Sequence, residues 1–366
     1  MDFTRFNFHP ELCAGIAACQ YTTPTPIQEK TIPPILKGRD VLGLAQTGTG
    51  KTAAFALPML QRFLGRKSTT ARGLIMAPTR ELAEQIHDNI QKMGRHTGLN
   101  SVTVYGGVGK NPQIKAFRRG VDIVVACPGR LLDLVNTGAA DLSGIEMLVL
   151  DEADQMLDMG FLPDIKRIIR QLPQKRQSLV FSATMPAEIA RLTRSILHRP
   201  ETVRINPSSS LPAISHSVFK VSKQGRTSLL KALFQDDGMA STLVFTRTKH
   251  KAKSLAAQLA KAGFSAASLQ GNLSQNKRRQ TMDGFRDGRF DILVATDIAA
   301  RGIDVSGVSH VVNYDLPDTV DTYIHRTGRT GRAKKSGRAY TFAAQEDMKM
   351  VARIEKTLGR KMEAVS

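Results

Sequence analysis

The sequence predicts two tandem α/β domains, each a mostly parallel sheet with helices on both faces, joined by a short linker. Three observations support this fold class. Short apolar segments alternate along the chain with amphipathic segments of helical period. The length of 366 residues is too great for one ordinary core and suits two. A stretch rich in Pro, Ser and Asn, with no charged residue, interrupts the alternation past the middle of the chain.

The first predicted domain spans residues 1–205. Because its strand segments are apolar throughout, they indicate a sheet that is buried on both faces. Helical patterns cover 80–93 and 186–197. The predicted strands lie within 40–45, 72–78, 101–105, 121–127, 145–151 and 177–183.

The interrupting stretch predicts a linker at 206–213, and the second domain then spans 214–366. The same alternation resumes there, with a helical pattern at 249–263. Its predicted strands lie within 241–246, 265–269, 290–296, 308–314 and 338–343.

The charge of the chain favours a polyanionic partner. Lys and Arg number 52 against 32 Asp and Glu, a formal net charge of +20, which points toward nucleic acid without deciding the matter. Cys13, Cys19 and Cys127 form no C-x-x-C pair, so neither a zinc site nor a disulfide framework is expected. The first residues lack the apolar core of a signal peptide, and no apolar run is long enough to cross a bilayer. We therefore expect a cytoplasmic protein with no membrane partner.

The segment "AQTGTGKT" at 45–52 follows an apolar strand and precedes a helix. It fits the phosphate loop G-x-x-x-x-G-K-[ST], except that Ala45 replaces the first glycine. Gly48 and Gly50 allow backbone N–H groups to converge on phosphate. Lys51 is predicted to reach the β- and γ-phosphates, and the Thr52 hydroxyl to ligate Mg²⁺. The predicted loop comprises Ala45, Gln46, Thr47, Gly48, Thr49, Gly50, Lys51 and Thr52.

The segment "MLVLDEAD" at 147–154 is a buried strand pattern that ends in three carboxylates within four residues. Carboxylates this close repel one another unless a cation neutralises them. Asp151 is predicted to hold the Mg²⁺ of a bound nucleotide, and Glu152 to act as general base toward the attacking water. Asp154 alone would also be explained as a helix N-cap.

The ordered set of motifs resembles the DEAD-box ATP-dependent RNA helicases over nearly the whole chain, and the context of "PTPIQ" is most similar to the bacterial RhlE-type subgroup. This resemblance implies that both domains are RecA-like. The matching motifs are "YTTPTPIQ" (21–28), "AQTGTGKT", "PTRELA" (78–83), "GG" (106–107), "PGR" (128–130), "DEAD" (151–154), "SAT" (182–184), "VFTRTK" (244–249), "QNKR" (275–278), "ATDIAARGID" (295–304) and "HRTGRTGR" (325–332).

The resemblance implies ATP as the nucleotide. Gln28 would read the adenine edge, Tyr21 would stack on the ring, and Asp304 would contact the ribose. Two residues depart from the family pattern. Gln20 stands where glycine is usual, which alters the loop under adenine, and Cys127 stands where threonine is usual, so we exclude it from the site.

The resemblance also implies roles in coupling and in transition-state stabilisation. Asp154, Ser182, Thr184 and His325 would link the ATP site to RNA binding. Arg329 and Arg332 would act in cis as arginine fingers on the γ-phosphate held by the other domain. Arg326, from the same motif, would serve structure.

The implied RNA contacts are to the backbone and indifferent to base identity, because no aromatic residues interleave with them. The glycines let backbone approach backbone, and the arginines suit phosphate. The contacts are Pro78, Thr79, Arg80, Gly106, Gly107, Gly129 and Arg130 in the first domain, and Thr246, Arg247, Arg278 and Thr296 in the second.

The predicted function is RNA-stimulated ATP hydrolysis coupled to domain closure, RNA bending and local, non-processive strand separation. Three alternatives stay open: an ATP-gated RNA clamp that serves as an assembly platform, a DNA helicase of the same superfamily, and a phosphate-loop kinase. The kinase leaves the second domain without a purpose. A monomer is expected, protein partners are not predicted, and ribosome assembly and RNA decay are the pathways that the resemblance implies.

Overall fold

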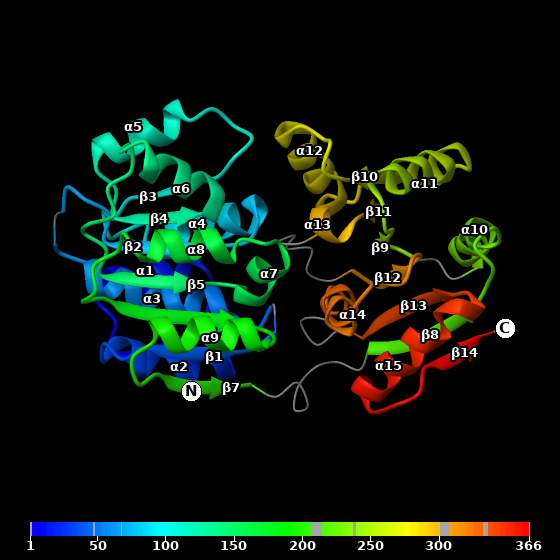
Figure 1. The fold of residues 1–366 in the computed structure, drawn as a ribbon, viewed down its shortest axis with the longest axis horizontal. Helices are drawn as coiled ribbons and strands as arrows, with labels where there is room; N and C mark the ends of the chain where they lie inside the picture. The colour runs from blue at the N-terminus through cyan, green and yellow to red at the C-terminus, as the bar shows by residue number, and fades with distance from the viewer. Residues whose placement is uncertain are drawn as a thin grey trace. The chain divides into compact units, whose positions relative to one another are not determined.

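The computed structural model describes residues 2–46, 48–66, 68–205, 214–236, 239–300, 308–331 and 336–365. The chain divides into two compact units, Met1–Asn206 and Pro207–Ser366, which Figure 1 colours from blue to red. The predicted linker at 206–213 lies outside the described residues, as do the predicted site residues Thr47, Asp304 and Arg332.

The first unit contains a seven-stranded sheet in the order β3-β4-β2-β5-β6-β1-β7, and every registered pair is parallel. Central strands such as β4 and β5 are buried along their whole length, which explains their continuous apolar sequence. The strands are β1 Val41–Leu44, β2 Gly73–Met76, β3 Ser101–Val104, β4 Ile123–Ala126, β5 Met147–Leu150, β6 Gln177–Ser182 and β7 Glu201–Arg204.

Helices cover both faces of this sheet, one core cluster to each face. Helices α1 to α4 pack on one face and α5 to α9 on the other, where Figure 1 shows α6, α8 and α9 in front of the strands. The helices are η1 Phe3–Phe6, α1 Pro10–Ala18, α2 Pro26–Leu36, α3 Lys51–Phe63, α4 Arg80–Met93, α5 Asn111–Arg119, α6 Pro128–Asn136, α7 Ala153–Asp158, α8 Leu162–Ile169 and α9 Ala187–Ile196.

The second unit contains another parallel sheet of seven strands, in the order β10-β11-β9-β12-β13-β8-β14. The strands are β8 Ile214–Lys220, β9 Thr242–Phe245, β10 Ala266–Leu269, β11 Ile292–Ala295, β12 His310–Asn313, β13 Gly337–Ala343 and β14 Glu363–Val365. The helices are α10 Arg226–Asp236, α11 Lys249–Lys261, α12 Gln275–Arg286, α13 Asp297–Ala300, α14 Val320–Thr327, η3 Gln345–Asp347 and α15 Met348–Leu358.

The two sheets have the same topology. When each sheet is numbered from its own first strand, both orders read 3-4-2-5-6-1-7. Strands β8, β12 and β13 of the second unit therefore correspond to β1, β5 and β6 of the first, and α10 corresponds to α3. Because all strands of a unit are parallel, the loops after their carboxyl ends gather at one edge of each sheet, where the predicted motifs lie.

The predicted helix at 80–93 coincides with α4, whose first turn is capped by the Thr79 hydroxyl accepting from the Leu82 N–H at 3.3 Å. The pattern at 186–197 extends one residue beyond α9 at each end, because Pro186 is the N-cap and Leu197 has turned extended. Within the described residues, no helix is long and apolar enough to cross a membrane.

Candidate nucleotide and RNA site

The phosphate loop connects β1 to α3 through two glycines in the left-handed region, Gly48 at φ 85° and Gly50 at φ 93°. A Cβ at Gly50 would lie 2.5 Å from Nε2 of Gln28, so only glycine fits there. Lys51 begins α3, and its buried ammonium donates to the Ala45 carbonyl at 3.1 Å. Lys51 thus connects the end of the loop to its beginning.

The amide of Gln28 joins the phosphate loop to helix α2. Its Oε1 accepts from the Thr25 N–H at 2.9 Å, and its Nε2 donates to the Gly50 carbonyl at 3.1 Å. Tyr21 is 36% exposed and stacks on Phe3, with 6.2 Å between ring centroids. Gln28 therefore lies against the phosphate loop and helps to fix its shape.

The DEAD box follows β5 directly. Asp151 is buried, and its Oδ1 lies 4.0 Å from the Lys51 ammonium. Burial raises the pKa of Asp151, and the Lys51 charge partly opposes that rise. Glu152 adopts a left-handed conformation, with φ 52° and ψ 52°, which a residue with a Cβ rarely takes. Such strain concentrates at functional sites, where it aims a side chain.

The predicted Mg²⁺ ligands fit the chemistry of that ion. The Thr52 hydroxyl and the Asp151 carboxylate are oxygen donors, and Mg²⁺ usually takes one or two protein oxygens together with phosphate oxygens and water. Among the residues described, no group of three or more His, Cys, Asp or Glu side chains is placed to hold a metal ion. A site completed by nucleotide phosphates agrees with that donor set.

Hydrogen bonds join the DEAD and SAT segments. Asp154 Oδ2 accepts from the Thr184 N–H at 2.7 Å, from its hydroxyl at 2.9 Å and from the Ala183 N–H at 3.1 Å. The Ser182 hydroxyl accepts from the Asp154 N–H at 3.2 Å and donates to the Thr184 carbonyl at 2.7 Å. The three residues predicted to couple the sites in this unit are in direct contact.

The two arginines among the predicted RNA contacts of the first unit, Arg80 and Arg130, both contact the loop after β3. A Cβ at Gly107 would lie 2.3 Å from the Arg80 guanidinium, so that arginine lies against bare backbone. Both terminal nitrogens of Arg130 donate to the Val108 carbonyl at 3.2 Å. Gly106 and Gly129 are open to solvent or partly so, whereas Pro78 and Thr79 are buried.

Sequence reasoning missed the residues that hold this loop. The Gln113 amide, on α5, donates to the Tyr105 carbonyl at 3.1 Å and to the Gly109 carbonyl at 3.4 Å. The Tyr105 hydroxyl donates to Glu84, and burial together with that bond raises the pKa of the phenol, which keeps it a donor. No motif marks Gln113 in the sequence, because its partners are backbone atoms.

In the second unit, the predicted RNA contacts lie after β9 and β11 and on α12. Thr246 and Thr296 are buried, and the Thr246 hydroxyl donates to the Thr248 carbonyl at 3.4 Å. Arg278 Nη2 donates to the Ala299 carbonyl at 3.3 Å. The Arg247 side chain is 60% exposed, whereas Arg278 is only partly exposed, so Arg247 is the most accessible of the four predicted contacts in this unit.

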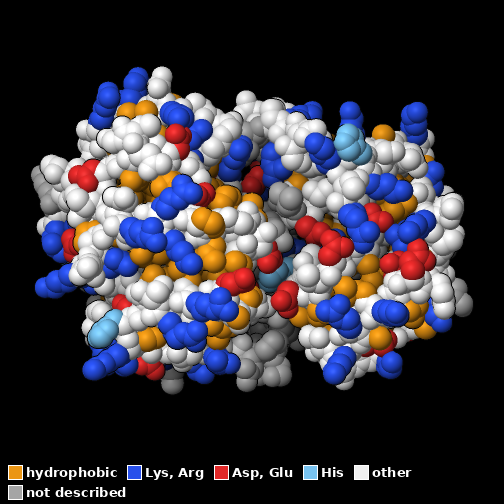
Figure 2. All heavy atoms as spheres, in the orientation of Figure 1, with side chains coloured by type: hydrophobic (Ala, Val, Ile, Leu, Met, Phe, Trp, Pro, Cys, Tyr) orange, Lys and Arg blue, Asp and Glu red, His pale blue; other side chains and the backbone are white. Residues whose placement is uncertain are grey.

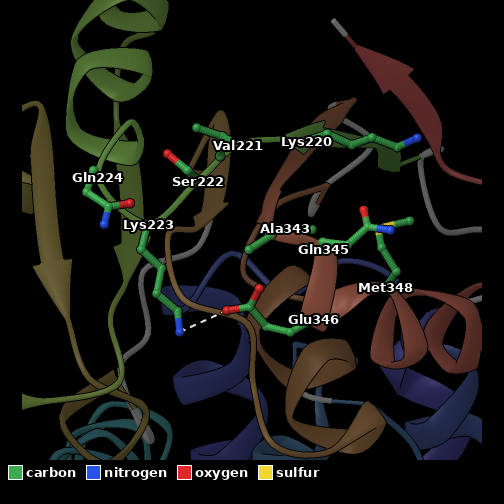
Figure 3. Close-up of a pocket in the computed structure, with 10 residues that line it drawn as sticks. Lys220, Val221, Ser222, Lys223, Gln224, Ala343, Gln345, Glu346 and Met348 are labelled. Atoms are coloured by element: carbon green, nitrogen blue, oxygen red, sulfur yellow. Dashed lines mark ion pairs between the residues drawn. The ribbon is translucent and has the colours of Figure 1, made fainter.

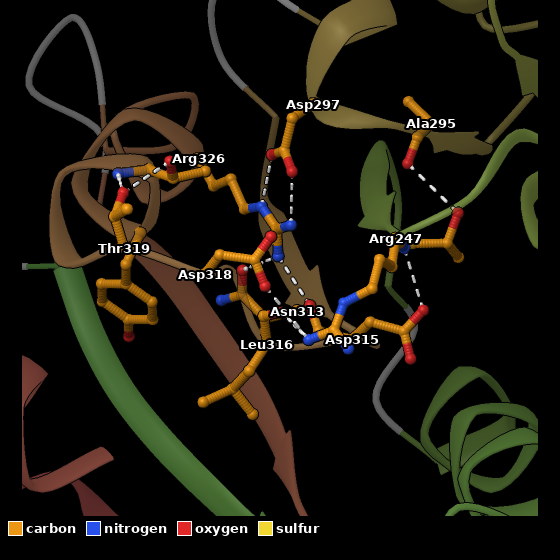
Figure 4. Close-up of polar contacts among 12 residues, drawn as sticks. Arg247, Ala295, Asp297, Asn313, Asp315, Leu316, Asp318, Thr319 and Arg326 are labelled. Carbon is orange, nitrogen blue, oxygen red and sulfur yellow. Dashed lines mark hydrogen bonds and ion pairs between the residues drawn. The ribbon is translucent and has the colours of Figure 1, made fainter. Parts of the chain in front are cut away.

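The arginines of "HRTGRTGR" differ in their surroundings. Arg326 makes a bidentate ion pair with Asp297 at 2.6 and 2.7 Å and also donates to Asn313 at 3.1 Å, as Figure 4 shows. Its contacts lie within the second unit, as expected for a structural arginine. His325 and Arg329 line a small pocket with it, and Arg329 is buried.

The first unit holds a phosphate loop beside a strand-end carboxylate, and a second unit of the same topology follows it. This combination defines a phosphate-loop ATPase of two tandem RecA-like domains, each a parallel sheet with helices on both faces. Comparisons with known proteins identify its family.

Residues 25–192 match the family described as DEAD/DEAH box helicase, and residues 225–334 match the helicase conserved C-terminal domain. The ATP-dependent RNA helicase CshA of Listeria monocytogenes is 41% identical over 362 residues, which is 99% of this chain and 69% of the relative. A DEAD-box ATP-dependent RNA helicase CshA of Streptococcus pneumoniae is 44% identical over 366 residues, 100% of this chain and 70% of the relative. The chain belongs to the DEAD-box ATP-dependent RNA helicase family.

Solved structures agree. The structure of S. cerevisiae Dbp5 bound to RNA and ADP BeF3 superposes with a TM-score of 0.91 at 34% identity, covering 100% of this chain and 95% of that one. A DEAD box protein from Methanococcus jannaschii is 35% identical over 100% of this chain and 99% of that one, with a TM-score of 0.58.

Proposed function

We propose that this protein hydrolyses ATP in response to RNA and uses the cycle to separate short duplexes locally. The observation that carries the proposal is the Asp154 network, because it joins the carboxylates beside the phosphate loop to the segment predicted to respond to RNA. A ligand at either place then biases the same buried contacts.

In the proposed ATPase site, the loop backbone and Lys51 bind the phosphates. Bound Mg²⁺, held by Thr52 and Asp151, would supply charge neutralisation. Glu152 takes the proton of the attacking water, and its left-handed backbone sets the direction of that carboxylate. Tyr21 and Gln28 orient the adenine.

The proposed RNA track uses the loop held by Arg130 and Gln113, Arg80 beside Gly107, and the exposed Arg247. These groups suit phosphate and carry no base readout. Figure 2 shows many further Lys and Arg side chains on the visible face of each unit, in agreement with the net charge of +20. Such a surface favours a polyanion at long range.

We further propose that ATP and RNA together draw the two units closed. Arg329 and Arg332 then act on the γ-phosphate, the RNA strand is bent, and a few base pairs open; hydrolysis releases the RNA. Each ligand favours the closed state, so each tightens the binding of the other.

The test is strand displacement on a short RNA duplex and on one several times longer, with ATPase measured in parallel. We expect the short duplex to be separated and the long one to resist, in agreement with non-processive opening. ATPase stimulation without displacement of either duplex would contradict unwinding and favour the clamp alternative. Glu152→Gln is the control for displacement without turnover.

The finer assignments stay predictions. The relatives reported above carry the name CshA, so the RhlE-type placement has no support from them. Cytoplasmic location and a monomeric state stay expectations from the sequence, and roles in ribosome assembly or RNA decay stay what the family resemblance implies.

A further inference from the structure

In the second unit, the position that corresponds to the phosphate loop of the first unit is occupied by a different segment. Residues 221–225 connect β8 to α10, as the phosphate loop connects β1 to α3. Figure 3 shows the resulting pocket between this segment and the one after β13, with Lys223 and Glu346 paired at 2.9 Å between the two segments. This carboxylate opposes an anion, so the pocket is not a second phosphate site.

The buried charged side chains at the start of α10 form ion pairs with one another. Arg226 begins α10 where Lys51 begins α3, and it is buried. Its Nη1 donates to Asp315 Oδ1 at 2.8 Å, and its Nη2 donates to Asp347 Oδ2 at 2.9 Å. The corresponding pair in the first unit, Lys51 with Asp151, is 4.0 Å apart.

Asp315 occupies a junction. It follows β12, the strand that corresponds to β5 of the DEAD box. Besides Arg226, its Oδ2 accepts from the Arg247 backbone N–H at 2.9 Å, and its carbonyl accepts from Arg326 Nη1 at 2.7 Å, as Figure 4 shows in part. One residue thus connects three arginines from α10, the β9–α11 loop and α14.

These contacts leave Arg247 held at its backbone and accessible at its head group. The Arg247 side chain donates to the Leu316 carbonyl at 3.3 Å, next to Asp315 in the chain, and lies 3.4 Å from the exposed Asp318. Arg326 is fixed in the same neighbourhood, three residues before Arg329. A backbone that is anchored beside a solvated guanidinium is preorganised for a phosphate.

We propose that Asp315 is a positioning residue that couples the RNA-contacting Arg247 to the segment carrying Arg329. At the position that corresponds to the nucleotide site of the first unit, the second unit has an ion-pair cluster in which Arg226, itself bonded to Asp347, fixes Asp315. The inference rests on the proposed function, because it assumes that Arg247 contacts RNA.

The direct test is Asp315→Asn. An amide offers one acceptor where the carboxylate offered two, so either Arg226 or the Arg247 N–H faces an N–H donor instead. We expect the RNA concentration for half-maximal ATPase to rise about tenfold and kcat to fall several-fold. The KM for ATP should stay within about twofold, because the proposed ATP contacts lie mainly in the first unit.

Two matched variants separate positioning from stability. Asp347→Asn also removes a carboxylate from Arg226 but contacts neither Arg247 nor Arg326 in the described interactions, so it should lower the melting temperature and leave the RNA half-saturation unchanged. Asp318→Asn removes only an exposed partner of Arg247 and should change little. If Asp315→Asn matches Asp347→Asn in both readouts, Asp315 is merely structural and the inference fails.

A double-mutant cycle gives a second readout. In an Arg247→Ala background, Asp315→Asn should weaken RNA half-saturation no further, because its effect runs through Arg247. Additive losses would overturn the proposal. If Asp315→Asn does not fold, Arg226→Lys is used instead, because one ammonium cannot hold both carboxylates in the geometry that the guanidinium gives them. If the folded Arg226→Lys variant has the same RNA half-saturation as the wild type, the proposal is overturned.

Failure of the proposed function can be distinguished from failure of this inference. It would show as a wild-type ATPase that ignores RNA, whereas failure of this inference leaves the wild type stimulated and Asp315→Asn normal.

Discussion

The two units share one strand order and differ in the residues that come after the equivalent strands. After β1 and β5 of the first unit come a glycine loop, a lysine and a carboxylate, and the last two lie 4.0 Å apart. After β8 and β12 of the second come Arg226 and Asp315, 2.8 Å apart, with Asp347 on the other side of the guanidinium. The more widely spaced charges of the first unit can still interact with a ligand, whereas the charges of the second unit are paired with one another. A shared fold therefore does not assign chemistry, which depends on the loops.

The largest expected effect concerns Arg329. Arg329→Ala should lower kcat by about 10³-fold while ATP binding changes little, because an arginine finger acts on transition-state charge. The measurement is single-turnover hydrolysis beside equilibrium binding of a fluorescent ATP analogue. Arg326→Ala is the contrasting variant. It leaves the Asp297 carboxylate without its arginine partner, so it should lower the free energy of unfolding by about 3 kcal/mol.

Glu152→Gln should lower turnover by about 10²-fold or more, because the amide cannot accept the proton of the attacking water. Binding of ATP and of RNA should persist. Glu188→Gln, an exposed glutamate on α9, is the matched control and should behave as wild type. Normal hydrolysis by Glu152→Gln would remove the general base from the account.

Gln113→Ala should weaken RNA binding about fivefold, because the loop after β3 loses both amide bonds from α5. The KM for ATP should not move. Gln91→Ala removes an exposed amide that donates to the Ser101 hydroxyl on β3 and serves as the control. Equal RNA affinity in the Gln113 and Gln91 variants would show that the loop keeps its shape without Gln113.

The smallest effect concerns Gln20, which has φ 57° at the place where the family usually has glycine. Gln20→Gly should raise the unfolding free energy by about 1 kcal/mol, because glycine adopts this conformation without strain. Arg199→Gly is the control, because Arg199 also has a positive φ, 42°, but lies far from Tyr21 in the sequence. Thermal unfolding of both variants checks the expectation, and a lower melting temperature for Gln20→Gly contradicts it.

Local motifs made much of the first unit predictable. The phosphate loop and the DEAD box are contiguous segments, and the buried strands before them are apolar throughout, so sequence alone located them. Partners that meet across the fold carry no such signal: Arg226 and Asp315 lie 89 residues apart, and the Gln113 amide donates to backbone carbonyls. Strands β7, β8 and β14 were missed. The edge strands β7 and β14 are short and partly polar, and the first half of β8 is mostly polar and directly follows the predicted linker.

The central claim is that RNA binding drives hydrolysis at the phosphate loop of the first unit. It is tested most directly by the steady-state ATPase rate titrated with single-stranded RNA and with DNA of matched sequence. We predict a saturable rise with RNA and little or none with DNA. Equal rates with and without RNA would contradict the account, and equal stimulation by DNA would favour a DNA helicase.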